Sequence, residues 1–228
     1  MFYNQIKMLL TYIIVSILIS GSLAYFAGSG IIVTVPALLW VGFDLKVAMA
    51  MSLGIVGVAA AYGAFVHYQR DNVAVKTGLL FGSFSAVGVI IGVELAQFMS
   101  DKILITLLAT IMIIAAAFLF RDAYQKPLSE TSHVKIECAN ISFLKLNLEG
   151  FLIGIITGLI GVGGGFLVVP ILVFFANIPF RRAMGTAFFV IAMKSLIGFL
   201  VYLFHVSISW PWFLILSFLA FIGVHLTN

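Results

Sequence analysis

Apolar runs, separated by short polar or glycine-rich interruptions, make up most of this chain. A helix needs about 20 consecutive apolar residues to cross a bilayer. By that measure the pattern predicts spanning helices over 8–26, 47–68, 73–98, 103–120 and 183–205. Shorter apolar runs cover 31–41, 148–160, 166–178 and 210–226, and the shortest cannot cross alone. The predicted fold class is an all-α polytopic membrane protein.

One long polar stretch interrupts the pattern, from Arg121 to Leu146. Its charged residues, Ser, Thr and Pro127 are typical of a linker rather than of a helix inside the membrane. We therefore expect a first membrane repeat over 1–120, a polar linker over 121–146 and a second membrane repeat over 147–228.

The two halves resemble each other in sequence, as expected for a duplicated unit. Four segments align in one order: Gly28–Pro36 with Val162–Pro170, Ala48–Ser52 with Ala183–Ala187, Gly63 with Gly198, and Gly92–Leu95 with Gly223–Leu226. The first half continues after its last matched segment through a whole predicted span, to Phe120, whereas the sequence given stops at Asn228. The second repeat is therefore expected to be incomplete, lacking its last span.

Glycine-rich breaks precede both short apolar runs, at Gly28–Gly30 and Gly161–Gly165. If each break joins two half-length segments, each complete half crosses the membrane an odd number of times, and the repeats are inverted. Broken helices inside a membrane are tolerated only where protein or a wet cavity satisfies their backbone groups. The start of a helix suits an anion, and glycine lets the backbone approach a ligand closely. We expect the breaks to face a shared anion cavity.

The candidate substrate-binding residues lie at or near these breaks or carry a hydroxyl or ammonium group within a span. They are Gly28, Ser29, Gly30, Ile31, Thr34, Ser52, Gly163, Gly164, Gly165, Phe166, Thr186 and Lys194. The alternative is structural: the glycines serve only close helix packing, and the hydroxyls bond back to their own helices. Lys194 would then need a partner that the sequence does not identify.

Glu94 and His225 occupy equivalent positions in the two repeats. Ionisable groups within membrane segments are costly and often functional. Both are candidates for coupling transport to protons, with Glu94 as the carrier, although both also lie close enough to span ends to reach the interface.

Composition supports the membrane class: 63% of residues are hydrophobic and 9% are charged, with a mean hydropathy of +1.24. Soluble domains carry about 25% charged residues. The composition excludes a soluble enzyme, a secreted disulfide scaffold and a disordered chain. The single cysteine, Cys138, excludes an intramolecular disulfide and a multi-cysteine zinc site.

The basic residues are unevenly shared between the two faces that the expected topology creates. One face carries Arg70, Lys76, Arg121, Lys126, Lys135, Lys145, Arg181 and Arg182, and the other carries Lys7, Lys46 and Lys102. The positive-inside rule places the richer face, with the linker, in the cytoplasm.

Two motifs carry a resemblance to a known family. Gly161–Pro170 reads Gly-x-Gly-Gly-Gly-x-x-x-x-Pro, and Ala183–Thr186 reads Ala-x-Gly-Thr; the first half has a looser counterpart with Pro36, Ala48 and Ser52. The chain resembles the sulfite exporter TauE/SafE family. The resemblance implies a multi-pass permease with two homologous halves that moves sulfite or small organosulfur anions across the plasma (inner) membrane.

We therefore expect a secondary permease for a sulfur-containing anion that works by alternating access, without a cofactor or metal and without nucleic acid as a partner. No P-loop lysine accompanies the glycines, so no nucleotide-driven step is expected. The alternative is a membrane enzyme, or a non-transporting membrane subunit, that acts on sulfur compounds or lipid. Enzyme function is disfavoured because no nucleophile–base pair, histidine cluster or paired carboxylate lies in a predicted span. The oligomeric state is left open.

Overall fold

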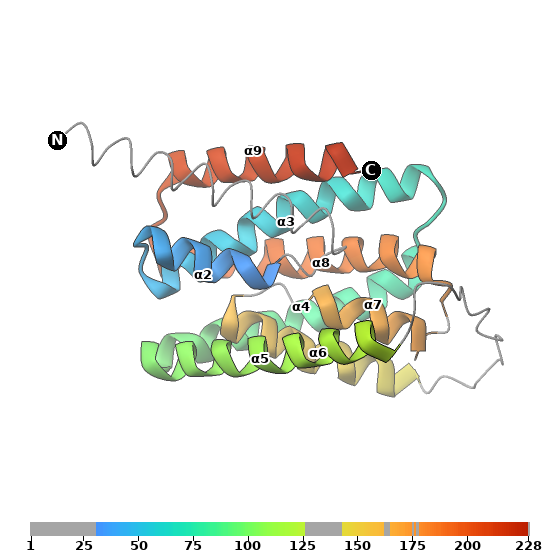
Figure 1. The fold of residues 1–228 in the computed structure, drawn as a ribbon, viewed down its shortest axis with the longest axis horizontal. Coiled ribbons are helices and arrows are strands. Elements are labelled where there is room, and N and C mark those ends of the chain that lie inside the picture. The colour runs from blue at the N-terminus through green and yellow to red at the C-terminus, as the bar shows by residue number, and fades with distance from the viewer. Residues whose placement is uncertain (1–30, 126–142, 162–164, 175, 177, 228) are drawn as a thin grey trace.

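A computed structural model describes residues 31–125, 143–161, 165–174, 176 and 178–227. Every regular element in these ranges is a helix, which confirms the all-α prediction (Figure 1). The helices are α2 (Ile31–Val41), α3 (Leu45–Gln69), α4 (Val75–Phe98), α5 (Asp101–Gln125), α6 (Phe143–Ile160), α7 (Gly165–Phe174), α8 (Phe180–Leu203) and α9 (Trp210–Thr227).

Three of the described helices, α3, α4 and α8, are long and apolar enough to cross a membrane. They correspond to the spans predicted over 47–68, 73–98 and 183–205. The predicted runs 103–120 and 210–226 lie inside α5 and α9, and 31–41 coincides with α2. Helix α5 continues to Gln125 and α6 starts at Phe143, so both extend into the range expected for the linker. The predicted span 8–26 lies outside the described residues.

Helices α3 and α8 pack antiparallel at the centre of the molecule. A Cβ atom on Gly63 of α3 would lie 2.9 Å from the Phe188 ring, and one on Gly198 of α8 would lie 3.1 Å from the Leu53 side chain. The late part of each helix therefore contacts the early part of the other, and the two helices run in opposite directions.

Two further helices flank this pair, each parallel to the helix of the opposite half. Helix α4 runs alongside α8 in the same direction, because Gly78 faces Phe189 and Gly82 faces Met193. Helix α9 runs alongside α3, and the centroids of the Tyr62 and Phe221 rings are 4.3 Å apart. We call the end where α3 turns into α4 the α3–α4 end, and the opposite one, where α4 turns into α5, the α4–α5 end.

Helices α4 and α6 contact each other backbone to backbone. A Cβ on Gly88 would lie 3.1 Å from the Gly154 Cα, and one on Gly92 would lie 3.0 Å from the Gly158 Cα. The same added Cβ atoms would overlap the Phe151 and Ile155 carbonyl oxygens. Small residues permit this close approach, which in a membrane supplies the packing energy that the hydrophobic effect does not. We call this contact the glycine seam.

The short helices α2 and α7 lie toward opposite ends of the molecule (Figure 1). Helix α2 leads into the start of α3, and α7 leads into the start of α8, and these starts are at opposite ends because α3 and α8 are antiparallel. Gly42 ends α2 with φ +102° and donates its N–H to the Leu39 carbonyl at 3.0 Å, while Phe43 donates to Leu38 at 3.2 Å. This is a glycine-capped helix end that side chains with a Cβ rarely adopt.

Candidate functional site at the end of helix α6

Two buried side chains of α8 reach the last turn of α6. The Lys194 ammonium donates to the Thr157 hydroxyl at 3.1 Å, and the Tyr202 hydroxyl donates to the Gly158 carbonyl at 3.0 Å. Lys194 and Tyr202 have no exposed surface, and Thr157 is 1% exposed. The Lys194–Thr157 hydrogen bond thus places the Lys194 ammonium at the end of α6, directly before the predicted break at Gly161–Gly165.

The end of α6 explains why polar groups gather here. The last carbonyls of a helix have no partner within the helix and carry partial negative charge. Tyr202 satisfies one of them, and the positive Lys194 is favourable beside the same helix terminus. Gly161 then closes the helix with φ +69°, donating to the Thr157 carbonyl at 2.9 Å.

Gly161 also lies against the first half of the chain. A Cβ added there would be 2.6 Å from the Met49 Cα on α3. Both the positive φ and this close approach favour glycine. The end of α6 is therefore fixed between α3 and α8, the two central helices.

The buried charge of Lys194 is the main electrostatic feature of the site. Within the described part of the chain, its polar partner is the neutral Thr157 hydroxyl, and no carboxylate pairs with it. A buried cation is costly unless an opposite charge or several hydrogen bonds compensate it. A single neutral hydroxyl leaves most of the charge of Lys194 uncompensated by described residues.

Several buried hydroxyls in the described part of the chain have no hydrogen-bond partner. Among the described residues, Thr34, Ser52 and Ser195 are fully buried, and their hydroxyl oxygens have no hydrogen-bond partner. Ser195 follows Lys194 on α8, and Ser52 lies one turn along α3 from Met49, the residue that Gly161 contacts. Buried polar atoms in folded proteins nearly always have partners, so these are candidates to meet a ligand or water.

Thr186, another predicted binding residue, has a different environment. Its hydroxyl donates to the Arg182 carbonyl at 2.6 Å and accepts the Ala74 N–H at 2.9 Å. Thr186 therefore connects the start of α8 to the residue that precedes α4, at the α3–α4 end. The structure does not bring Thr186 together with Lys194.

The remaining predicted binding residues belong to the breaks. Ile31 begins α2, and Gly165 and Phe166 begin α7. Gly28, Ser29, Gly30, Gly163 and Gly164 lie outside the described residues.

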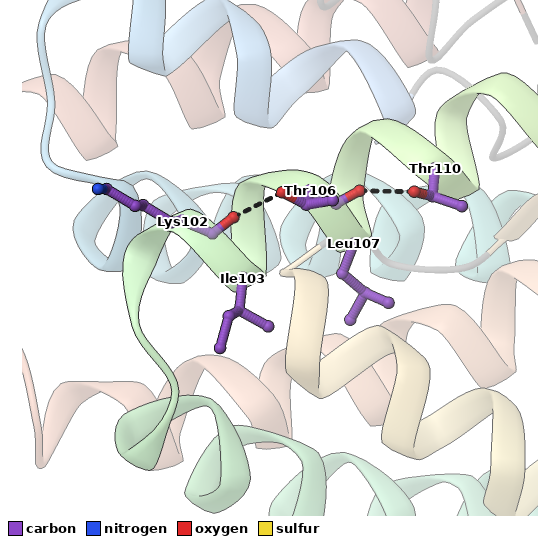
Figure 2. A pocket seen from close by; sticks show the side chains of 5 residues that line it. All are labelled: Lys102, Ile103, Thr106, Leu107 and Thr110. Atoms are coloured by element: carbon purple, nitrogen blue, oxygen red, sulfur yellow. Dashed lines mark hydrogen bonds between the residues drawn. The ribbon is translucent and has the colours of Figure 1, made fainter.

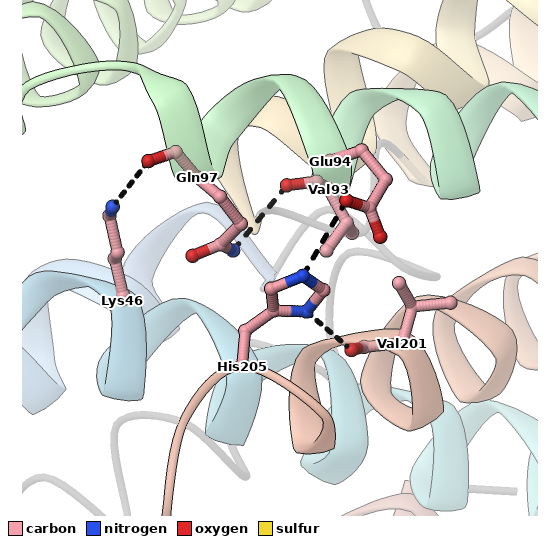
Figure 3. A network of polar contacts seen from close by, with 6 residues as sticks. All are labelled: Lys46, Val93, Glu94, Gln97, Val201 and His205. Carbon is pink, nitrogen blue, oxygen red and sulfur yellow. Dashed lines mark hydrogen bonds and ion pairs between the residues drawn. The ribbon is translucent and has the colours of Figure 1, made fainter.

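The two coupling candidates lie at opposite ends of the molecule. A Glu94 carboxylate oxygen lies 3.5 Å from the His205 Nε2 atom at the α4–α5 end, where Lys46 also donates to the Gln97 carbonyl at 3.1 Å (Figure 3). His225, on the last turn of α9, lies 2.6 Å from the Tyr62 hydroxyl at its Nδ1.

Thr157 and Tyr202 are the residues that the sequence analysis did not identify. Tyr202 is the repeat equivalent of His67, at the same sequence separation that relates Gly63 to Gly198. Thr157 precedes Gly161 by one helical turn. Those two relations are the sequence signals that point to them.

Two surface hollows lie away from this site. One of about 360 Å³ follows α5 along Lys102, Ile103, Thr106, Leu107 and Thr110 (Figure 2). Its threonine hydroxyls donate to carbonyls of their own helix, at 2.8 and 2.7 Å. The other, about 430 Å³, is an apolar groove between α3, α4 and α8. Neither contains a residue of the predicted site.

Comparisons with known proteins identify relatives of this chain. It is 26% identical to the probable membrane transporter protein YdhB of Bacillus subtilis over 84% of this chain and 78% of the relative. It is 25% identical to a probable membrane transporter protein of Xylella fastidiosa over 85% of this chain and 73% of the relative. A probable membrane transporter protein of Methanocaldococcus jannaschii is 28% identical over 70% of this chain and 57% of its own length. No solved structure matches the chain.

The family comparison covers nearly the whole sequence. The family model described as sulfite exporter TauE/SafE matches residues 13–228. This match, the apolar spanning helices and the transporter relatives agree with the resemblance found in the sequence. The chain belongs to the sulfite exporter TauE/SafE family and is a membrane permease.

Proposed function

We propose that this protein is a secondary permease that moves sulfite or another small sulfur-containing anion across the plasma membrane by alternating access. The observation that carries the anion assignment is the buried Lys194 ammonium, whose described partner is a neutral hydroxyl. A small anion that enters beside Lys194 supplies the missing opposite charge. The family name, which refers to sulfite, supports the substrate class.

The proposed binding place is the break between α6 and α7. Thr157 lies one turn before the break and accepts a hydrogen bond from Lys194, and α7 begins after the break at Gly165 with the backbone N–H groups of a helix start. The Ser52 and Ser195 hydroxyls have no described partner and are available to donate to oxyanion oxygens. In this proposal Gly161 and Gly165, on either side of the break, let the backbone approach the anion.

Alternating access requires two halves that move relative to each other, and we propose that these are inverted repeats. Two equivalent contacts support the proposal. Gly63 faces Phe188, and its repeat equivalent Gly198 faces Leu53, which is the repeat equivalent of Phe188. The antiparallel α3 and α8 and the opposite placement of α2 and α7 fit the same symmetry.

The proposed orientation puts the α3–α4 end and the linker in the cytoplasm. Arg70, Lys76, Arg181 and Arg182 lie at that end, whereas Lys46 and Lys102 lie at the other. This imbalance agrees with the positive-inside rule.

Flux into proteoliposomes tests this function. We expect uptake of radiolabelled sulfite by the wild-type protein, with thiosulfate and a small sulfonate measured in parallel. Lys194→Met should reduce sulfite flux at least tenfold, while Lys194→Arg, which keeps the charge, should retain more. The Met variant should fold, because it removes a costly buried charge and keeps a side chain of similar length.

Lys102→Met is the matched control because Lys102 is an exposed lysine on α5. It should leave the flux unchanged. Absence of flux for all three anions would refute the permease assignment for sulfur anions and favour a non-transporting subunit. Equal loss in both lysine variants would refute the role of Lys194.

A further inference from the structure

A polar contact joins the two halves of the chain at each end of the molecule. At the α4–α5 end, Glu94 of α4 lies 3.5 Å from the Nε2 atom of His205, which follows α8 (Figure 3). The His205 Nδ1 atom lies 3.1 Å from the Val201 carbonyl, which directs Nε2 toward Glu94.

The contact at the opposite end uses different residues. The Tyr62 hydroxyl of α3 lies 2.6 Å from the His225 Nδ1 atom of α9. The His225 ring stacks on Phe221 at 6.5 Å between ring centroids, with the planes 5° apart. This contact lies toward the α3–α4 end, because α3 and α9 both run in that direction.

One residue of each contact has an equivalent in the other contact under the internal repeat. Glu94 and His225 are equivalent residues, each near the end of the last matched helix of its half. Each pairs with a residue of the other half, although the partners His205 and Tyr62 are not equivalent to each other. By contrast, the nearby Lys46–Gln97 hydrogen bond joins two helices of the same half.

We propose that Glu94–His205 and Tyr62–His225 are two latches that close opposite ends of the transport path. This inference rests on the proposed alternating access, in which the halves separate at one end while they stay in contact at the other. Contacts between the halves at the opening end must then break and re-form in every cycle.

The exposure of these side chains suits reversible contacts. The side chain of Glu94 is 47% exposed and that of His205 is 29% exposed. Partly exposed groups lose less than fully buried ones when such a pair opens, so breaking it costs little. The close backbone contacts of the glycine seam, by contrast, are not suited to being broken and re-formed in this way. Both latches are engaged here, as in an intermediate closed at both ends.

Crosslinking tests the latches directly. In a Cys138→Ser background, cysteines replace Glu94 and His205 in one protein and Tyr62 and His225 in another. A short bismaleimide reagent, whose thioether bonds sulfite does not cleave, then joins each pair in proteoliposomes. We expect either crosslink to reduce sulfite flux at least tenfold, with a thermal unfolding midpoint no lower than that of the uncrosslinked protein, which shows that the protein stayed folded.

The control pair replaces Thr106 and Thr110, two exposed residues one turn apart on α5. Its crosslink should leave flux unchanged. Full flux with either latch quantitatively crosslinked would overturn the proposal.

Spin-label distances give a readout that does not depend on flux. Labels on each cysteine pair should show two distance populations whose ratio changes on addition of sulfite. A single, unchanged distance at both pairs would overturn the latches. If wild-type protein carries no sulfite but both pairs show two distances, the substrate proposal fails and the latches stand.

Discussion

Thr186 and Lys194 lie on the same helix and are both fully buried, yet their polar atoms have different partners. The Thr186 hydroxyl meets two backbone groups, the Arg182 carbonyl and the Ala74 N–H. The Lys194 ammonium meets one neutral hydroxyl. Among the described residues, Thr186 is therefore satisfied within the protein, whereas Lys194 has hydrogen-bonding capacity left for a ligand.

Substitution of Thr186 separates a structural role from a binding role. Thr186→Val leaves the part-buried Ala74 N–H without its partner, and the loss of a typical hydrogen bond costs about 0.5–1.5 kcal/mol. We expect a lower thermal unfolding midpoint in detergent and an unchanged KM for sulfite in the protein that folds. Thr186→Ser, which keeps the hydroxyl, should lie close to wild type. A raised KM without loss of stability would instead make Thr186 a ligand of the anion.

The partner of Lys194 could not be predicted from the sequence. The sequence places a lysine within a span and requires a compensating group, but it does not specify how α6 and α8 pack. Thr157 is 37 positions away and reaches Lys194 only through that packing. Tyr202 was missed for the same reason, since its partner is a backbone carbonyl that carries no sequence signature.

At the scale of helices, hydrophobic length predicted most of the described elements. Helix α2 occupies the run expected over 31–41, and α4 ends at the expected Phe98. The less accurate boundaries are those next to the linker, where amphipathic residues continue α5 to Gln125 without an apolar signal. The glycine seam was not predicted, although Gly150, Gly154 and Gly158 recur at the four-residue spacing that favours close helix contact.

The glycine seam makes a prediction about two glycines of the same helix. Gly88→Ala places a Cβ against the Phe151 carbonyl and the α6 backbone, which cannot move locally. Overpacking of this kind costs about 1–3 kcal/mol or more. We expect a clear fall in the thermal unfolding midpoint of the detergent-solubilised protein.

Gly82→Ala is the matched control on α4. Its added Cβ would lie 3.2 Å from the Met193 sulfur, and a flexible thioether can move aside. This variant should stay near the wild-type midpoint. Equal destabilisation by both substitutions would mean that the helical glycines are needed for a reason other than contact with the α6 backbone.

At the scale of the whole molecule, the repeat proposed from the sequence pairs contacts that are far apart in the chain. Gly63 and Gly198 were aligned from sequence, and each faces a bulky residue at the equivalent place on the other central helix. The alignment predicted equivalence but not that α3 and α8 would be direct neighbours. That neighbourhood depends on how the two halves are assembled, which no local pattern specifies.

Orientation in the membrane is the last property that the charge distribution predicts. Arg181 and Arg182 begin α8 at the end where α3 turns into α4, and basic residues are fewer at the opposite end. A reporter fused at Glu130 should therefore be cytoplasmic: green fluorescent protein should fluoresce there, and alkaline phosphatase should be inactive. Fusion at Ser100, between α4 and α5, should give the reverse. Phosphatase activity at Glu130 with fluorescence at Ser100 would invert the orientation, and would place the Glu94–His205 pair at the cytoplasmic end instead of the external one.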